Sequence, residues 1–398
     1  MQITGIVAEY NPFHTGHMYQ IQEARKITNC DLLIAVMSGN FVQRGEPAII
    51  DKWERAKCAV QNGVDLVIEL PYIYATQSCN QFAHGALTLL KLAGINSLSF
   101  GSECGNLDNL MEIAETSINP DHLHVSLDSG MSFPKSYSLL TTKMRPNDIL
   151  AVAYLKEIQT TDIKPIPITR TTNYLDEEMH ENISSATAIR KALKDNQDLN
   201  NTTPMEEVIK EKGMTFIEEY YPYIRTYLLT SNPKRLADTF LFSEGIENHI
   251  IEQAKKNPTY EGFIQDATNW RYTSSRIRRT LLQAANQITK EDVKKLPPLD
   301  TLRILAFNDK GREYLHNMRK KDVAIASRFA KIPLPYREME YKTTLFYSSI
   351  FAEEKRKELL SKEVGGALYI KWHISWCAIF YLFTFYVCIN FVYIVTII

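Results

Sequence analysis

The stretch Asn11-Pro12-Phe13-His14-Thr15-Gly16-His17 stands between an apolar run, Ile3 to Val7, and a run with helical periodicity, Met18 to Lys26. The first run predicts a short buried strand, and the second, with Ile21 and Ala24 on one face, predicts an amphipathic helix. A glycine lets the backbone approach a ligand closely, and a helix N-terminus offers unpaired N–H groups and a positive dipole end. Imidazoles on both sides of that glycine can donate to phosphate oxygens as charge builds on them. The stretch therefore predicts a strand–turn–helix grip for nucleotide phosphates.

A metal pair is the alternative interpretation of His14 and His17. Zinc sites use three or four protein ligands, and neither a cysteine nor a third histidine stands close to this pair in the sequence. The phosphate interpretation is therefore favoured, and no protein-bound metal ion is predicted.

Length and composition limit the classes of protein. The 398 residues favour two domains. Lys and Arg number 45 and Asp and Glu 46, a net charge of −1, which gives no global argument for nucleic-acid binding. The N-terminal apolar run is too short for a signal peptide, and Glu9 follows it. No two of the six cysteines form a Cys-x-x-Cys motif, which predicts reduced thiols and a cytoplasmic location; they are Cys30, Cys58, Cys79, Cys104, Cys377 and Cys388.

The first half of the chain alternates strand-like and helical patterns. Strands are predicted over Leu32–Met37, Leu66–Glu69 and Ser97–Phe100, with helices over Trp53–Gln61 and Asn80–Ala93. Such alternation predicts an α/β fold with a Rossmann-like parallel sheet, in which ligands bind beyond the carboxyl ends of the strands. Polar or glycine residues follow each predicted strand: the histidine turn, Ser38-Gly39-Asn40, Glu69-Leu70-Pro71 and Gly101-Ser102-Glu103. The four strand ends therefore predict one shared site.

A second phosphate clamp is predicted further along the chain. A helix over Ile149–Ile158 and a strand over Ile163–Ile168 precede Arg170 and the segment Ile183-Ser184-Ser185-Ala186-Thr187-Ala188-Ile189-Arg190. Ser184 or Ser185 can cap a helix that begins near Ala186, with Arg190 one turn in. An ordinary N-cap is the alternative for this segment alone. Together with the upstream histidines, it predicts the opposite wall of a phosphate site.

The pattern becomes helical after a polar linker at 195–204. Helices are predicted over Met205–Lys212, Lys234–Leu241, Glu247–Lys256, Ser274–Ala285 and Thr301–Phe307. No strand is predicted between them, so this half is expected to be an all-α domain. It also holds the densest positive charge, and Tyr272 stands beside the first of two clusters: Arg271, Arg276, Arg278 and Arg279, then Lys310, Arg312, Arg319, Lys320 and Lys321. A solvated helix face and an RNA-binding face are both consistent with these clusters.

The C-terminal segment differs from everything before it. No charged residue follows Lys371, and Ile374 to Ile398 is a run of 25 almost wholly apolar residues. That length suits a bilayer-spanning helix. A buried terminal helix and a tail read in a shifted frame are the alternatives.

The order of strand, His-x-Gly-His, α/β domain and Ile-Ser-Ser-x-x-x-Ile-Arg resembles the nucleotidylyltransferase superfamily. Longer stretches resemble the bacterial tRNA(Met) cytidine acetate ligase family, and the resemblance extends to about residue 350. These stretches are Gly5–His17, Met37–Ala48, Asp65–Pro71, Phe100–Glu103, Arg145–Leu150 and Phe307–Arg312.

The resemblance implies a ligase that activates acetate with ATP and Mg²⁺, releasing pyrophosphate. The acetyl group of the adenylate would then pass to N4 of the wobble cytidine of elongator tRNA(Met), giving N4-acetylcytidine. The implied domains are a catalytic ATP/acetate domain at 1–195, an α-helical tRNA-binding domain at 205–365 and the apolar tail at 372–398. No protein partner is implied.

The resemblance and the residue patterns together assign the site. His14 and His17 are the predicted catalytic residues, acting as stabilisers of the leaving pyrophosphate. The predicted ATP site comprises Val7, Ala8, Glu9, Tyr10, Asn11, Pro12, Phe13, His14, Thr15, Gly16, His17, Met18, Tyr19, Gln20, Gly101, Asn147, Arg170, Thr171, Ser184, Ser185 and Arg190. The predicted tRNA contacts are Arg271, Arg276, Arg278, Arg279 and Lys310.

Two other functions remain open at the level of sequence. One is a nucleotidylyltransferase that acts on a small phosphorylated metabolite, which the large basic helical region argues against. The other is a non-catalytic RNA-binding relative, which the intact histidine turn and serine pair disfavour.

Overall fold

The computed structural model of the chain describes residues 1–115, 144–170, 184–199 and 201–371. Thr171 and the apolar tail lie outside the described residues. Within the described part, no helix is both long and apolar enough to cross a membrane.

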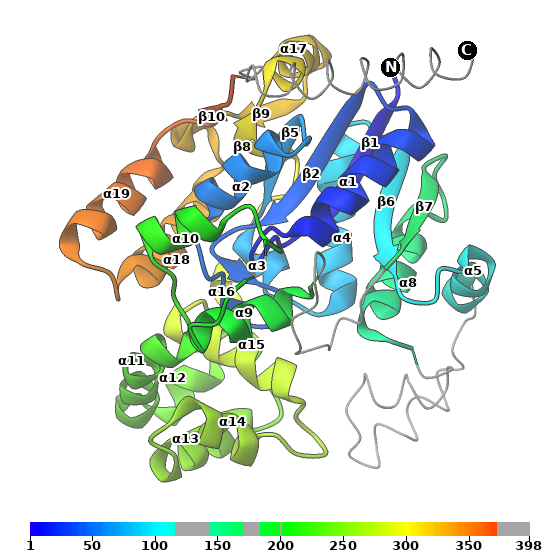
Figure 1. Ribbon diagram of the computed structural model, residues 1–398. Coiled ribbons are helices and arrows are strands. Elements are labelled where there is room, and N and C mark those ends of the chain that lie inside the picture. The colour runs from blue at the N-terminus through cyan, green and yellow to red at the C-terminus, as the bar shows by residue number, and fades with distance from the viewer. Residues whose placement is uncertain (116–143, 171–183, 200, 372–398) are drawn as a thin grey trace, which may run out of the picture.

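An eight-stranded, mostly parallel sheet forms the centre of the molecule (Figure 1). The strand order is β10-β8-β5-β2-β1-β6-β7, with β9 paired to β8. The central strands are parallel, whereas β8 runs antiparallel to β5. The strands are β1 (Ile3–Ala8), β2 (Leu32–Ser38), β5 (Leu66–Leu70), β6 (Ser97–Ser102), β7 (Lys164–Thr169), β8 (Thr301–Phe307), β9 (Ala324–Ala326) and β10 (Leu368–Tyr369).

Helices cover both faces of this sheet. Alternation along β2 sends Leu32 and Ile34 into a core with α4 and α8, while Leu33 and Ala35 enter a second core with α1, α2 and α9. The helices of the α/β part are α1 (Thr15–Thr28), α2 (Lys52–Gln61), α3 (Tyr72–Ala75), α4 (Cys79–Leu92), α5 (Leu107–Glu115), α8 (Pro146–Ile158), α9 (Ala186–Lys194), α10 (Glu206–Lys212), α17 (Asp309–Met318), α18 (Leu334–Ser348) and α19 (Glu353–Val364). The prediction of a mostly parallel α/β fold is confirmed.

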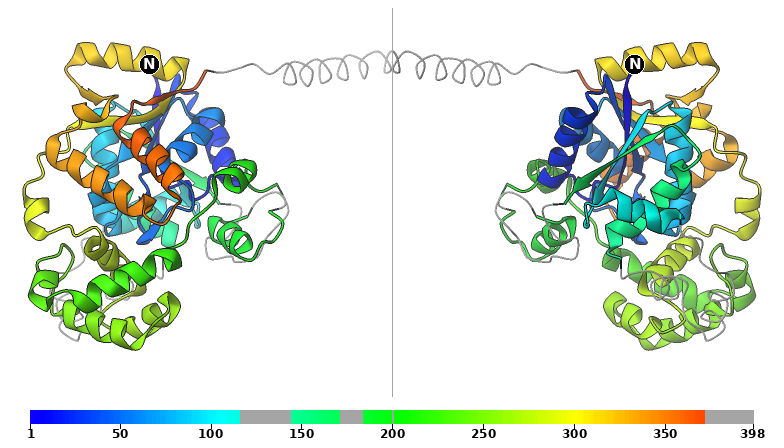
Figure 2. Two further views of the ribbon diagram at one scale, coloured as in Figure 1. Left: turned by 90° about the vertical axis from the view of Figure 1, so that its left-hand side faces the viewer. Right: turned by 90° about the vertical axis from the view of Figure 1, so that its right-hand side faces the viewer.

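A helical part packs beneath the carboxyl ends of the parallel strands β1, β2, β5, β6 and β7 (Figures 1 and 2). It consists of α11 (Ile217–Thr230), α12 (Pro233–Ala237), α13 (Ile246–Lys256), α14 (Tyr260–Ala267), α15 (Ser274–Ala285) and α16 (Lys290–Lys294). Its core also contains Phe41, Trp53, Tyr72 and Ile73 from the α/β part. The two parts therefore share one apolar interior.

The prediction of a helix over Thr301–Phe307 is wrong, because this segment is strand β8. Leu302 and Ile304 enter one core of the sheet, and Leu305 and Ala306 enter the other. A short apolar run is compatible with a buried helix or a buried strand, and here pairing with β5 decides. The chain thus returns to the sheet after α16, although the division into domains at 195–205 stays a prediction. The helix expected over Lys234–Leu241 is also shorter, since α12 ends at Ala237.

Candidate functional site

The two histidines of the turn cap helix α1 reciprocally. His14 is the N-cap, and its Nδ1 accepts a hydrogen bond from the Gly16 N–H at 3.0 Å. His17 Nδ1 accepts from the His14 N–H at 3.2 Å. The ring centroids lie 3.8 Å apart. Because both Nδ1 atoms accept, each neutral ring carries its proton on Nε2, which makes Nε2 a donor.

Both imidazoles are neutral in this environment. Burial, together with the nearby Arg170 and Arg190 guanidinium groups, lowers the pKa of His14 to about 3. Burial, His14 and Arg170 hold the pKa of His17 well below its usual range. The positive charge of the site therefore comes from the arginines, and the histidines supply neutral N–H donors.

Most of the predicted nucleotide residues surround one cavity of about 130 Å³ at the carboxyl ends of β1 and β6. Those that line it are Val7, Ala8, Glu9, Tyr10, Asn11, His14, His17, Gln20, Gly101, Asn147, Arg170 and Arg190. The other predicted residues in the described part of the chain do not line it: Pro12, Phe13, Thr15, Gly16, Met18, Tyr19, Ser184 and Ser185. Whether any of these residues binds ATP stays a prediction.

A buried arginine fixes the loops that frame this cavity. The Arg55 guanidinium donates to the carbonyl oxygens of Glu9 at 2.6 Å and Ser38 at 3.1 Å, and also to that of Gly39. These carbonyls belong to the ends of β1 and β2, so one side chain from α2 holds two strand ends in register. Glu9 in turn accepts the Gln43 N–H at 2.7 Å, and burial raises the pKa of its carboxyl.

Adjacent residues have different roles at the far wall. Asn147 lines the cavity and donates from both its backbone N–H and its side-chain amide to the Glu103 carboxylate, at 3.0 and 2.9 Å. Asp148 is buried, and its Oδ1 accepts from the Ser102 hydroxyl at 2.7 Å. Asp148 therefore fixes the turn after β6, while Asn147 faces the cavity.

Ser185 is the N-cap of α9, as the sequence predicted for one of the two serines. Its hydroxyl accepts the Ala188 N–H at 3.0 Å, and both Ser184 and Ser185 are fully buried. The lining instead contains Ala186 in the first turn and Arg190, whose guanidinium donates to the Asn11 carbonyl at 2.8 Å. The first turns of α1 and α9 thus border the same cavity, which is a favourable arrangement for an anion.

Several lining residues were not predicted from the sequence. A short hairpin, β3 (Phe41–Val42) and β4 (Glu46–Pro47), contributes Val42, Gln43, Arg44 and Glu46. Its Gly45 has φ +83°, and a Cβ there would lie 2.5 Å from the Arg279 backbone nitrogen, so glycine is needed where the hairpin docks on α15. Phe82, Leu150 and Tyr154 come from helices α4 and α8. The hairpin directly follows the polar end of β2, Ser38-Gly39-Asn40, so its position in the sequence could have indicated that it lies near the site.

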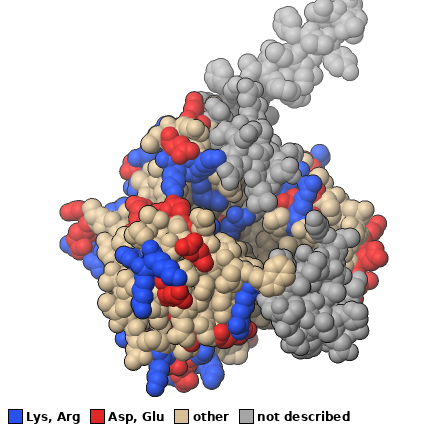
Figure 3. Space-filling model, turned by 90° about the horizontal axis from the view of Figure 1, so that it is seen from below, with Lys and Arg blue, Asp and Glu red and all other residues tan. Residues whose placement is uncertain are grey.

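The predicted tRNA-binding residues do not form one cluster. Arg271 and Arg276 share Glu244, at 3.4 and 3.5 Å, and both lie over the Tyr272 ring. Arg278 pairs with Glu46 of the hairpin, and Arg279, half-buried, donates to the Gln43 carbonyl at 3.4 Å. Lys310 belongs to α17, at the opposite end of the molecule from α15 (Figures 1 and 2). Seen from below, the helical part carries charges of both signs interspersed with uncharged surface (Figure 3).

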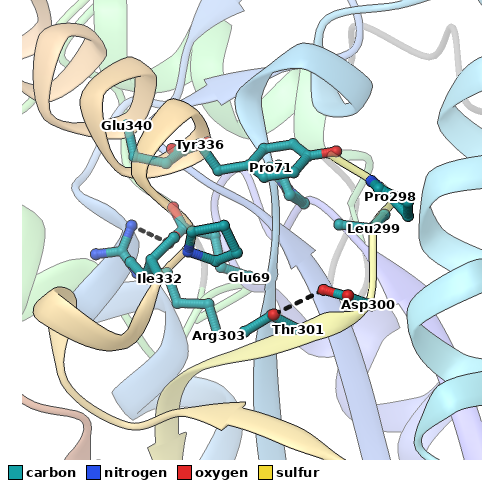
Figure 4. Close-up of a pocket in the computed structure, with 11 residues that line it drawn as sticks. Glu69, Pro71, Pro298, Leu299, Asp300, Thr301, Arg303, Ile332, Tyr336 and Glu340 are labelled. Carbon is teal, nitrogen blue, oxygen red and sulfur yellow. Dashed lines mark hydrogen bonds and ion pairs between the residues drawn. The ribbon is translucent and has the colours of Figure 1, made fainter. Parts of the chain in front are cut away.

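A small second cavity adjoins a buried ion-pair cluster (Figure 4). Glu69 of β5 and Glu363 of α19 each pair with both Lys52 and Arg303, at 2.6 to 2.8 Å. Glu340 of α18 lies beside them and accepts the Tyr72 N–H at 2.6 Å. Burial and the Glu69 charge raise the pKa of Glu340 to about 8, so it is mostly protonated at neutral pH. With Glu340 neutral, the carboxylates of Glu69 and Glu363 balance the positive charges of Lys52 and Arg303.

Acid is expected to destabilise the fold through His14. Its pKa is about 3 in the folded chain against 6.5 as a free side chain, so the unfolded chain binds more protons between these values. Stability therefore falls as the pH drops below 6.5, by about 2 kcal/mol between pH 7 and pH 5 for His14 alone. Urea unfolding at both pH values measures this loss, and His14→Asn should remove that share of it. The control is His316→Asn, at an exposed position on α17; the same acid sensitivity in His14→Asn as in the wild type would contradict the assignment.

The described residues contain no group of three or more His, Cys, Asp or Glu side chains placed to hold a metal ion. Cys30, Cys58, Cys79 and Cys104 are free thiols.

Known proteins resemble this chain over most of its length. The HIGH Nucleotidyl Transferase family matches residues 1–362. A tRNA(Met) cytidine acetate ligase of Limosilactobacillus reuteri is 40% identical over 81% of this chain and 88% of its own length. A tRNA(Met) cytidine acetate ligase of Geobacillus sp. is 35% identical over 91% of this chain and 98% of its own length.

Solved structures show the same architecture. Thermotoga maritima TmcAL without ligand has a TM-score of 0.85 at 31% identity, covering 94% of this chain and 100% of that one. The same protein bound with alpha-thio ATP gives a TM-score of 0.84 with the same identity and coverage. The likeness thus includes the sheet, the helical part and the return of the chain at β8. On these grounds the chain belongs to the tRNA(Met) cytidine acetate ligase family of HIGH nucleotidyl transferases, and it is a ligase.

Proposed function

We propose that the chain activates acetate with ATP and transfers the acetyl group from acetyl-adenylate to N4 of the wobble cytidine of elongator tRNA(Met). The observation that carries the proposal is the cavity in which His14, His17, Arg170 and Arg190 meet the first turns of α1 and α9. The names of the relatives support the RNA and acetate substrates, and the neighbour bound with alpha-thio ATP supports the nucleotide.

The first step joins two anions, so the site must offset their repulsion. An acetate oxygen forms a bond to the α-phosphorus, and the bond to the pyrophosphate oxygen breaks with its electron pair leaving on pyrophosphate. The guanidinium groups of Arg170 and Arg190 bind phosphate oxygens, and the Nε2–H groups of His14 and His17 donate to the leaving group. Catalysis then rests on positioning and electrostatics, with no side-chain nucleophile.

Mg²⁺ is proposed to enter as a complex with ATP. Protein sites for Mg²⁺-nucleotides commonly leave most of the coordination to phosphates and water. That fits a cavity whose described lining has arginine and histidine donors and two carboxylates, Glu9 and Glu46. When bound, the ion would neutralise charge on the phosphate oxygens.

The second step needs the cytidine outside its base stack. The N4 lone pair forms a bond to the acetyl carbon, the bond from that carbon to the AMP oxygen breaks, and AMP leaves with the electron pair. N4 loses one proton to a carboxylate or to water.

Arg271 and Arg276 share one acidic partner, Glu244, among the described residues, so their combined charge is only partly balanced. We therefore expect them to contact RNA phosphates. The Arg271→Ala/Arg276→Ala variant should bind tRNA more weakly and lower the slope of log affinity against log salt by about 1 for each lost contact. Filter binding across a salt series measures this slope. Lys357→Ala, at an exposed position on α19, is the control. A salt slope unchanged in the double variant would remove these arginines from the interface.

Mass analysis of tRNA nucleosides tests the proposed function. Protein, ATP, Mg²⁺ and acetate are incubated with unmodified elongator tRNA(Met), with no acetyl-CoA present. The expected product is one N4-acetylcytidine per tRNA, and isotope-labelled acetate should appear in it. Label that stays out of the tRNA, with no ATP–pyrophosphate exchange, would reject the proposal.

A further inference from the structure

A cavity of about 330 Å³ lies next to the candidate ATP cavity, at the junction of the β3–β4 hairpin with α11 and α14. Its floor is apolar and includes Pro47, Ile217 and Ile264. Charged side chains form its rim. Arg271 and Arg276, the arginines that contact Glu244, do not line this cavity.

Two side chains line both cavities, Glu46 and Arg190. Arg190 also donates to the Asn11 carbonyl of the histidine turn at 2.8 Å. Glu46 is held by an ion pair with Arg278 of α15. A group bound in the cavity between the hairpin, α11 and α14 therefore lies against the site where the proposed acetyl-adenylate would form.

Aromatic side chains give this cavity the character of a base pocket. Phe216 is half-buried at its wall, where a ring face can stack on a base. Tyr260 is 5% exposed, and its buried hydroxyl has no hydrogen-bond partner among the described residues. The Arg278 guanidinium lies 6.0 Å from the Tyr260 ring centroid. An unused buried hydroxyl in such a setting points to a polar ligand atom that would complete it.

The rim matches cytosine among the bases. Carboxylates accept from the exocyclic amine of cytosine, and guanidinium groups donate to its ring nitrogen and carbonyl oxygen. Glu46 and Arg190 provide one of each at the border of the two cavities.

We infer that this cavity is the acceptor pocket, which receives the extruded cytosine and directs its N4 toward the neighbouring cavity; the inference rests on the proposed function. N4 attacks the acetyl carbon, the carbon–oxygen bond to AMP breaks with its electrons on AMP, and the proton from N4 passes to the Glu46 carboxylate. Phe216 stacks on the base, and the Tyr260 hydroxyl bonds to it.

Two reactions of the intact protein separate this pocket from the adenylation site. ATP–pyrophosphate exchange with acetate needs no RNA, whereas acetyl transfer needs both cavities. Phe216→Ala should keep exchange within about twofold of wild type and slow transfer in a single turnover by about 5- to 150-fold, the value of one lost base stack. Tyr260→Phe, which removes only the hydroxyl, should slow transfer by about fivefold. Tyr223→Ala, at an aromatic residue of α11 that is 61% exposed, should change neither reaction.

A binding measurement gives a readout that does not depend on the chemistry. The probes are an anticodon stem-loop RNA with cytidine at the acceptor position and the same RNA with an abasic residue there. Wild type should prefer the cytidine RNA, and Phe216→Ala should lose most of that preference. Equal losses of exchange and transfer in Phe216→Ala, or an unchanged preference for cytidine, would overturn the inference. Absence of exchange in the wild type would instead reject the proposed function.

Discussion

Replacing His14 by Asn is expected to slow acetate-dependent ATP–pyrophosphate exchange by about 100- to 1,000-fold with little loss of stability. This slowing is the usual effect of removing one hydrogen-bond donor to the charge that develops on the leaving group. The donor lost is Nε2–H, because Nδ1 is already engaged with the Gly16 N–H. Asn can accept that N–H as an N-cap, so the helix end survives the change.

His14→Ala separates catalysis from capping. It should lose exchange to the same extent but also about 1 kcal/mol of stability, because the cap of α1 is removed. His17→Asn should match His14→Asn in exchange, since its Nδ1 has the same arrangement. Urea unfolding at pH 7 and exchange assays on the three variants make the comparison. Full exchange by His14→Asn would show that the turn does not stabilise the leaving group.

The sequence was sufficient for this part of the site because its geometry is local. A strand, a turn and a helix follow one another within Ile3–Thr28, so the residues that face the ligand can be identified from the order alone. The same holds for Arg170 directly after β7 and Arg190 in the second turn of α9. Parallel strands bring such ends to one edge of the sheet, whatever their separation in the chain.

The rest of the site depends on packing between distant segments, which one sequence does not reveal. Tyr154 and Leu150 lie within a helix and look like ordinary core residues, and only the docking of α8 brings them to the cavity. An arginine in an amphipathic helix usually lies at the surface. Arg55 is instead fully buried and donates to backbone carbonyls. The error at β8 has the same origin, since the partner strand β5 precedes it by more than 200 residues.

Glu363→Gln is expected to destabilise the chain by about 3–5 kcal/mol, the usual cost of removing one partner from a buried ion pair. Glu363 is fully buried and lies 2.8 Å from Lys52 and 2.7 Å from Arg303. It also accepts the Thr344 hydroxyl at 2.8 Å. These contacts hold α19 and α18 to the sheet, so the last part of the described chain should loosen first.

Glu340→Gln, a matched change in the same cluster, should not lower the free energy of unfolding. The pKa of Glu340 is about 8 in the folded chain and 4.5 as a free side chain, so its contribution to stability is lost as the pH rises from 4.5 through 8. Glutamine keeps the acceptor for the Tyr72 N–H and cannot ionise in the unfolded chain. The variant should therefore equal the wild type or exceed it by up to about 3 kcal/mol at pH 7. Urea unfolding at pH 5, 7 and 9 tests both variants, and a loss in Glu340→Gln as large as that in Glu363→Gln would mean that Glu340 is an ionised member of the cluster.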